Sequence, residues 1–220
     1  MTNSSYRTLT AGLIAAWFAF AIVASALHIF ETSPDRPPLP LLLAVGVPIV
    51  LFSLWYSSSR GFRDFVLSLS PRTLTMVQSW RIAGYVFLVL YTYGILPGSF
   101  ALPAGWGDMF IGATALIVAG KVANPNCRKT FITWQLLGVT DLVVAVSSGA
   151  FQRIFHPAAL AGSSVVNTGP MTVLPLSLIP TFGVPLFLIL HIICVAQARR
   201  WSVLEPKCGS EELKPITVRS

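Results

Sequence analysis

The sequence predicts an all-α integral membrane protein, a compact bundle of about six transmembrane helices with one short interfacial helix. Only 10% of its 220 residues are charged, whereas soluble domains carry about 25%. The mean hydropathy is +0.72, so lipid must be the solvent for most of the surface. Apolar runs of about 20 residues, the length that a helix needs to cross a bilayer, recur along the chain.

Six apolar stretches have the length of a spanning helix, and short polar or turn-forming segments separate them. Residues 31–38 are rich in proline, residues 95–99 form a predicted tight turn, and residues 121–129 are basic with a proline. We therefore expect a single membrane domain over residues 1–220. Its predicted spans are 9–30, 39–57, 74–96, 101–120, 130–150 and 174–197.

Basic residues gather in alternate loops, and this asymmetry predicts the orientation. Cytoplasmic loops of membrane proteins carry an excess of lysine and arginine. Loops assigned to the outside hold only Arg36 and Arg153. We therefore expect both termini, with the tail 199–220, on the cytoplasmic side of the cell (plasma or inner) membrane. The inside loops and the tail hold Arg7, Arg60, Arg63, Arg72, Lys121, Arg128, Lys129, Arg199, Arg200 and Lys207.

Residues 61–69, between the second and third spans, predict the short interfacial helix. Their apolar side chains recur at helical spacing and their polar side chains fall opposite, the pattern of a helix lying in the membrane interface. Ser70 and Pro71 then have the form of an N-cap and a first-turn proline that open span three. The apolar positions are Phe62, Phe65, Val66 and Leu69.

Ionisable side chains inside the spans are the first candidates for a functional site, because they are costly in lipid and mark function by default. Their number is small here, and one buried amide accompanies them. The alternative for each is a structural role: an arginine near the end of a span can snorkel to the headgroups, and a lone histidine can simply be hydrogen-bonded. The candidates are Arg81, Asp108, Asp141, His191 and Gln135.

Spans four and five share the pattern Gly-x-x-Asp-x-x-x-small-x-x-small. Small residues let helices approach closely in a bilayer, so the pattern predicts that the two spans pack together and that both aspartates point into the bundle. The alternative is that each aspartate only helps to join helices. The predicted packing positions are Gly105, Gly112 and Ala115 in span four and Gly138 and Ala145 in span five.

The two aspartates are expected at nearly the same depth. Asp108 and Asp141 lie seven and nine residues from the outer ends of their spans, which places both carboxyls roughly 10–14 Å into the membrane. Two neighbouring carboxylates cannot both ionise cheaply, so a proton, a cation or an arginine must lie between them. Arg81 would balance their charge, while Gln135 and His191 would form a polar layer on the cytoplasmic side.

These features favour a small transporter or channel-like permease for an ion or small polar solute, coupled to protons or cations through the carboxylate pair. Prolines within spans two and six are typical of the broken helices of transporters. The sequence holds no metal-ligand spacing or cofactor motif, and its basic residues flank spans instead of forming a nucleic-acid surface. The expected partners are therefore the lipid bilayer and a solute or cation, with a homo-oligomer left open.

Two other function classes remain open on the sequence. A membrane-embedded enzyme or redox protein could use the carboxyl pair as acid and base on a lipid or quinone. An accessory or scaffold subunit could use the polar groups only to pack helices. A long apolar pocket ending at Asp108 would favour the first, and aspartates replaceable by asparagine at no cost would favour the second.

The predicted orientation can be tested by cysteine labelling. In a background without the native cysteines, a cysteine at Ser163 should react with a membrane-impermeant maleimide in intact cells, because loop 151–173 is predicted outside. A cysteine at Ser210, in the predicted cytoplasmic tail, is the matched control and should react only after lysis. Labelling of the Ser163 position only after lysis would contradict the topology.

Overall fold

The structure of the chain, a computed structural model, describes residues 3–32, 37–155 and 166–201. Its regular structure over these residues is helical, with no strand, which confirms the predicted all-α class. Within the described ranges, six helical stretches are long and apolar enough to cross a membrane, so the chain is a multi-pass membrane protein. They are Asn3–Ala26, Leu39–Ser58, Pro71–Thr92, Gly98–Val122, Pro125–Gln152 and Ile179–Arg199.

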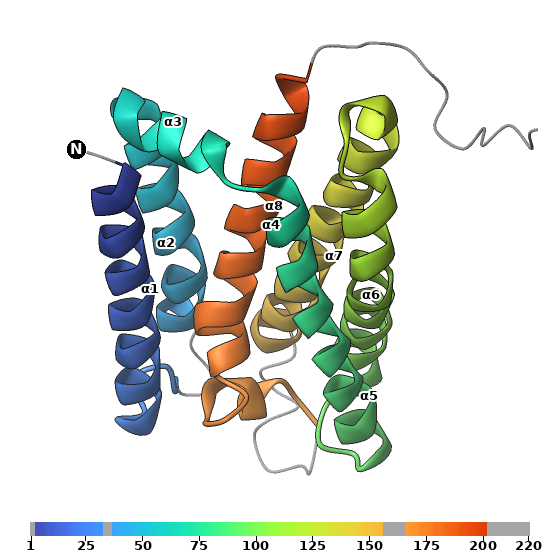
Figure 1. The fold of residues 1–220 in the computed structure, drawn as a ribbon. Coiled ribbons are helices and arrows are strands. Elements are labelled where there is room, and N and C mark those ends of the chain that lie inside the picture. Colours follow the sequence, from blue (N-terminus) through green and yellow to red (C-terminus); the bar gives the residue numbers. More distant parts are fainter. Residues whose placement is uncertain (1–2, 33–36, 156–165, 202–220) are drawn as a thin grey trace, which may run out of the picture.

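The first two spans are the single helices α1 (Asn3–Ala26) and α2 (Leu39–Ser58), and the short helix α3 (Arg60–Ser68) follows them. α3 lies across one end of the bundle, beside the N-terminus, as Figure 1 shows. The Ser59 hydroxyl caps α3 by accepting a hydrogen bond from the Phe62 N–H at 3.2 Å. We call this end, where the inside loops of the predicted topology gather, the basic end.

Span three is built from three helical pieces: α4 (Pro71–Val77), the 3₁₀ segment η1 (Gln78–Gly84) and α5 (Tyr85–Thr92). Ser70 caps it, accepting a hydrogen bond from the Thr73 N–H at 3.3 Å, as the Ser-Pro pair predicted. A 3₁₀ stretch inside a longer helix often marks a strained or functional segment. In this span it holds Arg81.

The later spans are also interrupted. Span four is α6 (Gly98–Ile117), which ends in the π-helical turn η2 (Val118–Val122). Span five joins the 3₁₀ turn η3 (Pro125–Cys127) to α7 (Arg128–Phe155). Span six is the π-helical segment η6 (Ile179–Gly183) followed by α8 (Val184–Arg199).

Span six begins at Ile179, five residues later than the predicted start at 174. Pro175 explains the difference, because it lies at the start of the predicted span, lacks an N–H donor and disfavours helical backbone in the residue before it. The preceding residues instead form the short 3₁₀ turn η5 (Gly169–Thr172) and a non-helical segment.

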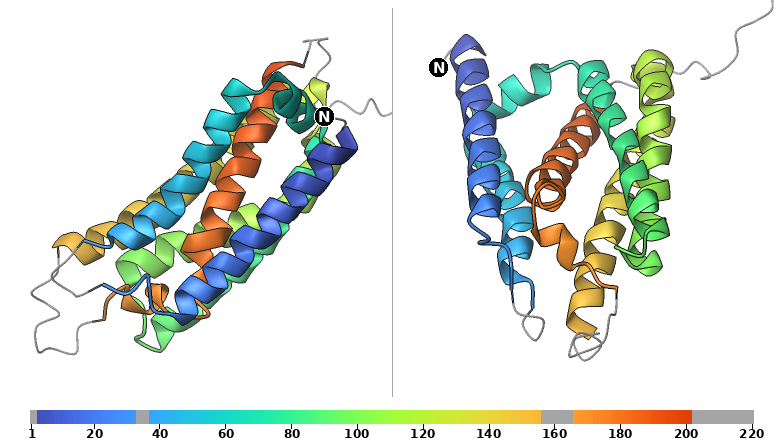
Figure 2. Two further views of the ribbon diagram at one scale, coloured as in Figure 1. Left: turned by 90° about the vertical axis from the view of Figure 1, so that its left-hand side faces the viewer. Right: turned by 90° about the horizontal axis from the view of Figure 1, so that it is seen from below.

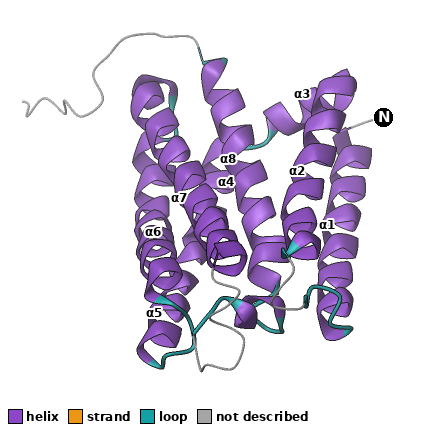
Figure 3. Ribbon diagram, turned by 180° about the vertical axis from the view of Figure 1, so that it is seen from behind, coloured by secondary structure: helices purple, strands orange, loops and turns teal. Residues whose placement is uncertain are grey.

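α8 is the central helix of the bundle. It packs against α2, α3, α4 and α7. The second view of Figure 2 shows α8 between the α1–α2 pair on one side and α5, α6 and α7 on the other, and the view from behind in Figure 3 shows the same division. α1 is attached more loosely, because its main contacts are with α3 and η6.

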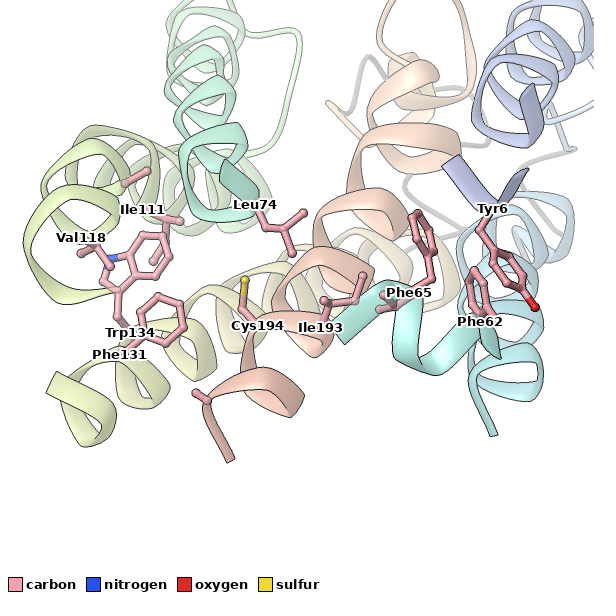
Figure 4. Packing of buried hydrophobic residues seen from close by; sticks show 13 residues of the cluster. Tyr6, Phe62, Phe65, Leu74, Ile111, Val118, Phe131, Trp134, Ile193 and Cys194 are labelled. Carbon is pink, nitrogen blue, oxygen red and sulfur yellow. The ribbon is translucent and has the colours of Figure 1, made fainter. Parts of the chain in front are cut away.

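The largest apolar core fills the basic end of the bundle (Figure 4). α3 contributes Phe62, which stacks on Trp55 with ring centroids 3.7 Å apart, and Phe65, which stacks on Tyr6 at 5.7 Å. Between α6, α7 and α8 the core continues through buried side chains from each helix. These are Ile111, Phe131, Trp134, Ile193 and Cys194.

The small residues of α6 face span three. A Cβ atom at Gly112 would run into the backbone N of Ile82, and one at Gly105 would come within 2.7 Å of the Leu88 side chain. Spans four and five do pack against each other, as the pattern predicted. Gly105 and Gly112, however, face span three and not span five, because the pattern does not specify which neighbour a small face meets. Their contact brings η1 backbone to backbone with α6.

This close approach makes a prediction about stability. Gly112→Ala should lower the free energy of unfolding by about 1–3 kcal/mol, because its methyl group has no space against the η1 backbone. Gly46→Ala is the matched control: nothing lies within 4 Å of a Cβ there, and alanine favours a helix by about 1 kcal/mol over glycine. Thermal melting in detergent measures both, and equal melting temperatures would contradict the contact.

Candidate functional site

Arg81 lies at the centre of a polar cluster formed by spans three to six. Its side chain is 1% exposed, so it points into the bundle and does not snorkel. Nε donates to Asp108 Oδ1 at 2.7 Å, and Nη2 donates to Asp141 Oδ2. Nη1 donates to the Gly138 carbonyl at 3.3 Å. One guanidinium therefore joins span three to spans four and five through charge-assisted hydrogen bonds.

A second chain of hydrogen bonds leads from Arg81 toward the basic end. Arg81 Nη1 lies 3.1 Å from His191 Nε2, and His191 Nδ1 lies 2.5 Å from Gln135 Oε1. Gln135 Nε2 donates to Thr75 Oγ1 at 3.1 Å, and that hydroxyl donates to the Pro71 carbonyl at 2.8 Å. His191 and Gln135 are both 0% exposed.

The direction of this chain fixes the state of His191. The guanidinium can only donate, so His191 Nε2 must accept from Arg81. Gln135 Oε1 can only accept, so His191 Nδ1 must carry the proton. The network therefore assigns a neutral His191 with its proton on Nδ1, and each group donates to the next in one direction.

Glycines on neighbouring spans make room for three of the polar side chains. A Cβ atom at Gly84 of span three would collide with Asp108, one at Gly107 of span four with Asp141, and one at Gly138 of span five with His191. Each polar side chain thus lies against a glycine of the preceding span. Any larger residue at these positions would displace a member of the cluster.

The charges of the cluster do not cancel. Two carboxylates face one guanidinium and a neutral imidazole, so the group carries one negative charge when both carboxyls are ionised. The side chains of Asp108 and Asp141 are 14% and 13% exposed, in contrast to Arg81. The remaining negative charge therefore lies on the more accessible side of the cluster.

Asp108 also lines a cavity of about 70 Å³. Thr172 of η5 and its N-cap residue Thr168 form part of the cavity wall. Because η5 lies at the end of the bundle opposite the basic end (Figure 1), the cavity extends toward that end. Phe87 and Phe100 line it as a T-shaped pair with ring centroids 5.4 Å apart. The other lining side chains are mainly aliphatic, and Asp108 is the charged residue among them.

All five candidate side chains of the sequence analysis meet in this one network. Arg81 lies between Asp108 and Asp141, while His191 and Gln135 form a buried layer toward the basic end. Spans four and five also place the small residues Ala115 and Ala145 in apolar contacts, Ala115 in the core of the basic end and Ala145 beside the cavity.

Sequence reasoning missed Thr75 and Gln78, which are buried polar residues of span three. Gln78 Nε2 donates to the Phe187 carbonyl at 3.3 Å. A signal was present: Thr75, Gln78 and Arg81 recur every third residue, and residues three apart lie close to one face of a helix. The glycine positions Gly84 and Gly107 carried no comparable signal.

The fold and this cluster define a multi-pass membrane protein with a buried arginine–aspartate site. A family model described as a domain of unknown function (DUF8737) matches residues 37–199, and the chain belongs to that family. The match includes the whole cluster and begins after α1. No curated protein and no solved structure matches the chain. Within the described residues, no group of three or more His, Cys, Asp or Glu side chains could hold a metal ion.

The cluster predicts a large effect of removing its cation. Arg81→Gln should lower the free energy of unfolding by about 3–5 kcal/mol, because it leaves two buried carboxylates unpaired. Adding Asp108→Asn should recover part of the loss, since it removes one of the uncompensated charges. The exposed Arg200→Gln is the matched control and should melt like the parent. An Arg81→Gln protein with parental stability would show that the ion pairs contribute nothing.

Proposed function

We propose that the protein is a small membrane permease for a small organic cation, coupled to protons through Asp108 and Asp141. The observation that supports it is the uncompensated negative charge of the cluster at the inner end of an apolar cavity. We also propose that the protein lies in the cell membrane with its basic end in the cytoplasm, so that the cavity opens outward.

Charge balance supports a cationic substrate. A net negative charge inside a bundle is unfavourable unless a proton or a cation neutralises it. A bound proton and a bound cation therefore compete for the same charge. Such competition is the simplest form of coupling, because the arrival of one species releases the other.

The size and lining of the cavity narrow the substrate class. A cavity needs a volume of about 10–15 Å³ to hold one water. The cavity beside Asp108, of about 70 Å³, therefore has room for roughly five to seven water-sized groups. Metal cations such as Ca²⁺ need six or more oxygen ligands, whereas this lining is mostly aliphatic and aromatic. Phe87 and Phe100 instead suit the cation–π recognition of an ammonium group. A small organic ammonium fits better than a hydrated metal ion.

The bundle is closed on the other side of the cluster. Neutral hydrogen-bonded side chains and the apolar core of the basic end lie between Asp108 and that end. Transport would require this end to open. The irregular segments η1 and η6 flank the site, since Arg81 lies on η1 and the cavity wall includes Ile179 and Pro180 of η6. Such interruptions of regular helices are common in transporters, where they lie at binding sites.

A second class is favoured by the apolar lining itself. A pocket of aliphatic and aromatic side chains ending at one carboxyl also suits a membrane enzyme or redox protein that acts on a quinone or lipid. Net charge separates the two proposals, since a neutral quinone would not be selected for its charge.

Tetramethylammonium is a suitable probe, because it has five heavy atoms, a permanent charge and no proton of its own. It should raise the melting temperature of the purified chain more than sodium chloride of equal ionic strength. Proteoliposomes should accumulate labelled tetramethylammonium when a proton gradient, acidic inside, is imposed. Binding of tetramethylammonium should release protons from the protein. Asp108→Asn should abolish both effects.

Neopentanol, a neutral molecule with the same four-substituted centre and one more heavy atom, is the ligand control, and the exposed Arg200→Gln is the protein control. Stabilisation by neopentanol equal to that by tetramethylammonium would reject a cationic substrate and favour the enzyme or redox alternative. Binding without uptake would reject transport. If Asp108→Asn and Asp141→Asn changed neither stability nor binding, the cluster would act only in helix packing.

A further inference from the structure

A second cavity, of about 890 Å³, lies on the side of α8 that faces α1 and α2. α1 contacts the bundle at two levels. Near its start, Tyr6 packs on Phe62 and Phe65 of α3, and further along Trp17 packs on Phe182 at 4.8 Å. Trp17 Nε1 also donates to the Thr181 carbonyl at 3.2 Å. Tyr6 and Trp17 are about 16 Å apart along the helix axis, and the cavity occupies the space between and beyond them.

The cavity wall is almost wholly apolar, and α1 forms one side of it without a main contact to α2 or α8. Leu13 and Ile14 of α1 face Ala44 and Val47 of α2 across it, and Ile189 of α8 forms part of its base. This space is open to the surrounding membrane because α1 has its main contacts only with α3 and η6. A flexible hydrocarbon chain from the bilayer can therefore enter it.

Three arginines lie next in sequence to residues at the basic end of this cavity. Arg7 is adjacent to Tyr6, whose hydroxyl lies so close to Gly61 that a Cβ atom there would be 2.8 Å from it. Arg60 and Arg63 flank that glycine on α3. Among the described residues, none of these three arginines forms an ion pair. Asp64 is the acidic residue beside them, so the local charge is positive.

A buried hydroxyl lies between the arginines and the apolar part. Thr10 lines the cavity about one helical turn deeper than Arg7. Its Oγ1 is buried and has no hydrogen-bond partner among the described residues. The order along the cavity is therefore guanidinium, hydroxyl and hydrocarbon. A glycerophospholipid presents phosphate, ester carbonyl and acyl chain in the same order.

We propose that this cavity binds an anionic glycerophospholipid, with its acyl chains between α1, α2 and α8 and its phosphate at Arg7, Arg60 and Arg63. Clusters of basic residues at the cytoplasmic surface bind anionic headgroups in this way. The Thr10 hydroxyl donates to an ester carbonyl. The lipid fills the space that α1 leaves open and holds α1 against the rest of the bundle.

Native mass spectrometry of the full chain in a non-ionic detergent tests this site. The probes are phosphatidylglycerol and phosphatidylcholine with identical dioleoyl chains. The parent should retain phosphatidylglycerol at about tenfold lower lipid concentration. The triple variant Arg7→Gln, Arg60→Gln, Arg63→Gln should bind both lipids equally. Its substitutions lie on exposed or partly exposed residues, so folding should be unaffected.

A pair of tryptophan variants tests the acyl-chain part. Ala44→Trp fills the cavity and should reduce retention of both lipids at least tenfold, whereas Ala113→Trp, on the exposed face of α6, should not. Equal retention of the two headgroups by the parent would overturn the proposal. So would unchanged retention in Ala44→Trp, or a lipid-free dimer that Ala44→Trp disrupts. Asp108→Asn should leave lipid retention unchanged, so failure here is distinct from failure of the permease proposal.

Discussion

The pairing of Arg81 with two carboxylates is the constraint on which the architecture of spans three to six depends. An arginine inside a bilayer is unfavourable unless hydrogen bonds and opposite charge replace its water. Here two aspartates, a backbone carbonyl and a histidine supply them from three different spans. A shift of any one span by a single turn would separate a charge from its partner. The cluster therefore fixes the register of four helices at one level.

The glycines are the steric counterpart of this electrostatic constraint. Short hydrogen bonds between neighbouring spans require backbones that approach closely, and side chains that point toward a neighbour need space in its surface. Gly112 allows the first by bringing α6 against η1, while Gly84, Gly107 and Gly138 allow the second. Apolar burial contributes little specificity here, because lipid is as apolar as the helix surfaces. Close packing and polar pairing carry it instead.

Much of this arrangement was predictable from local chemistry. Charge depletion and run length gave the six spans, and counting residues from the span ends put Asp108 and Asp141 at one depth. The direction of Arg81 was not predictable, because a long side chain near a span end can reach the headgroups or the interior at similar local cost. Its inward direction depends on the 3₁₀ backbone of η1 and on the close contact of η1 with Gly112 of α6. That contact is a tertiary feature, which the residues around Arg81 do not specify. Likewise, the packing of α6 against α7 was predictable from their small residues, but the contact of Gly105 and Gly112 with span three was not.

α1 is a sixth span outside the region of the family match, and it decides at which end of the bundle the described chain starts. The family match covers residues 37–199, which contain five of the six spans. An odd number of crossings leaves the two ends of that region on opposite faces of the bilayer. α1 adds the sixth crossing and returns the N-terminus to the face that carries the end of α8, as Figure 1 shows. This peripheral helix therefore places the start of α1 and the end of α8 at the same end of the bundle, while contributing no side chain to the polar cluster.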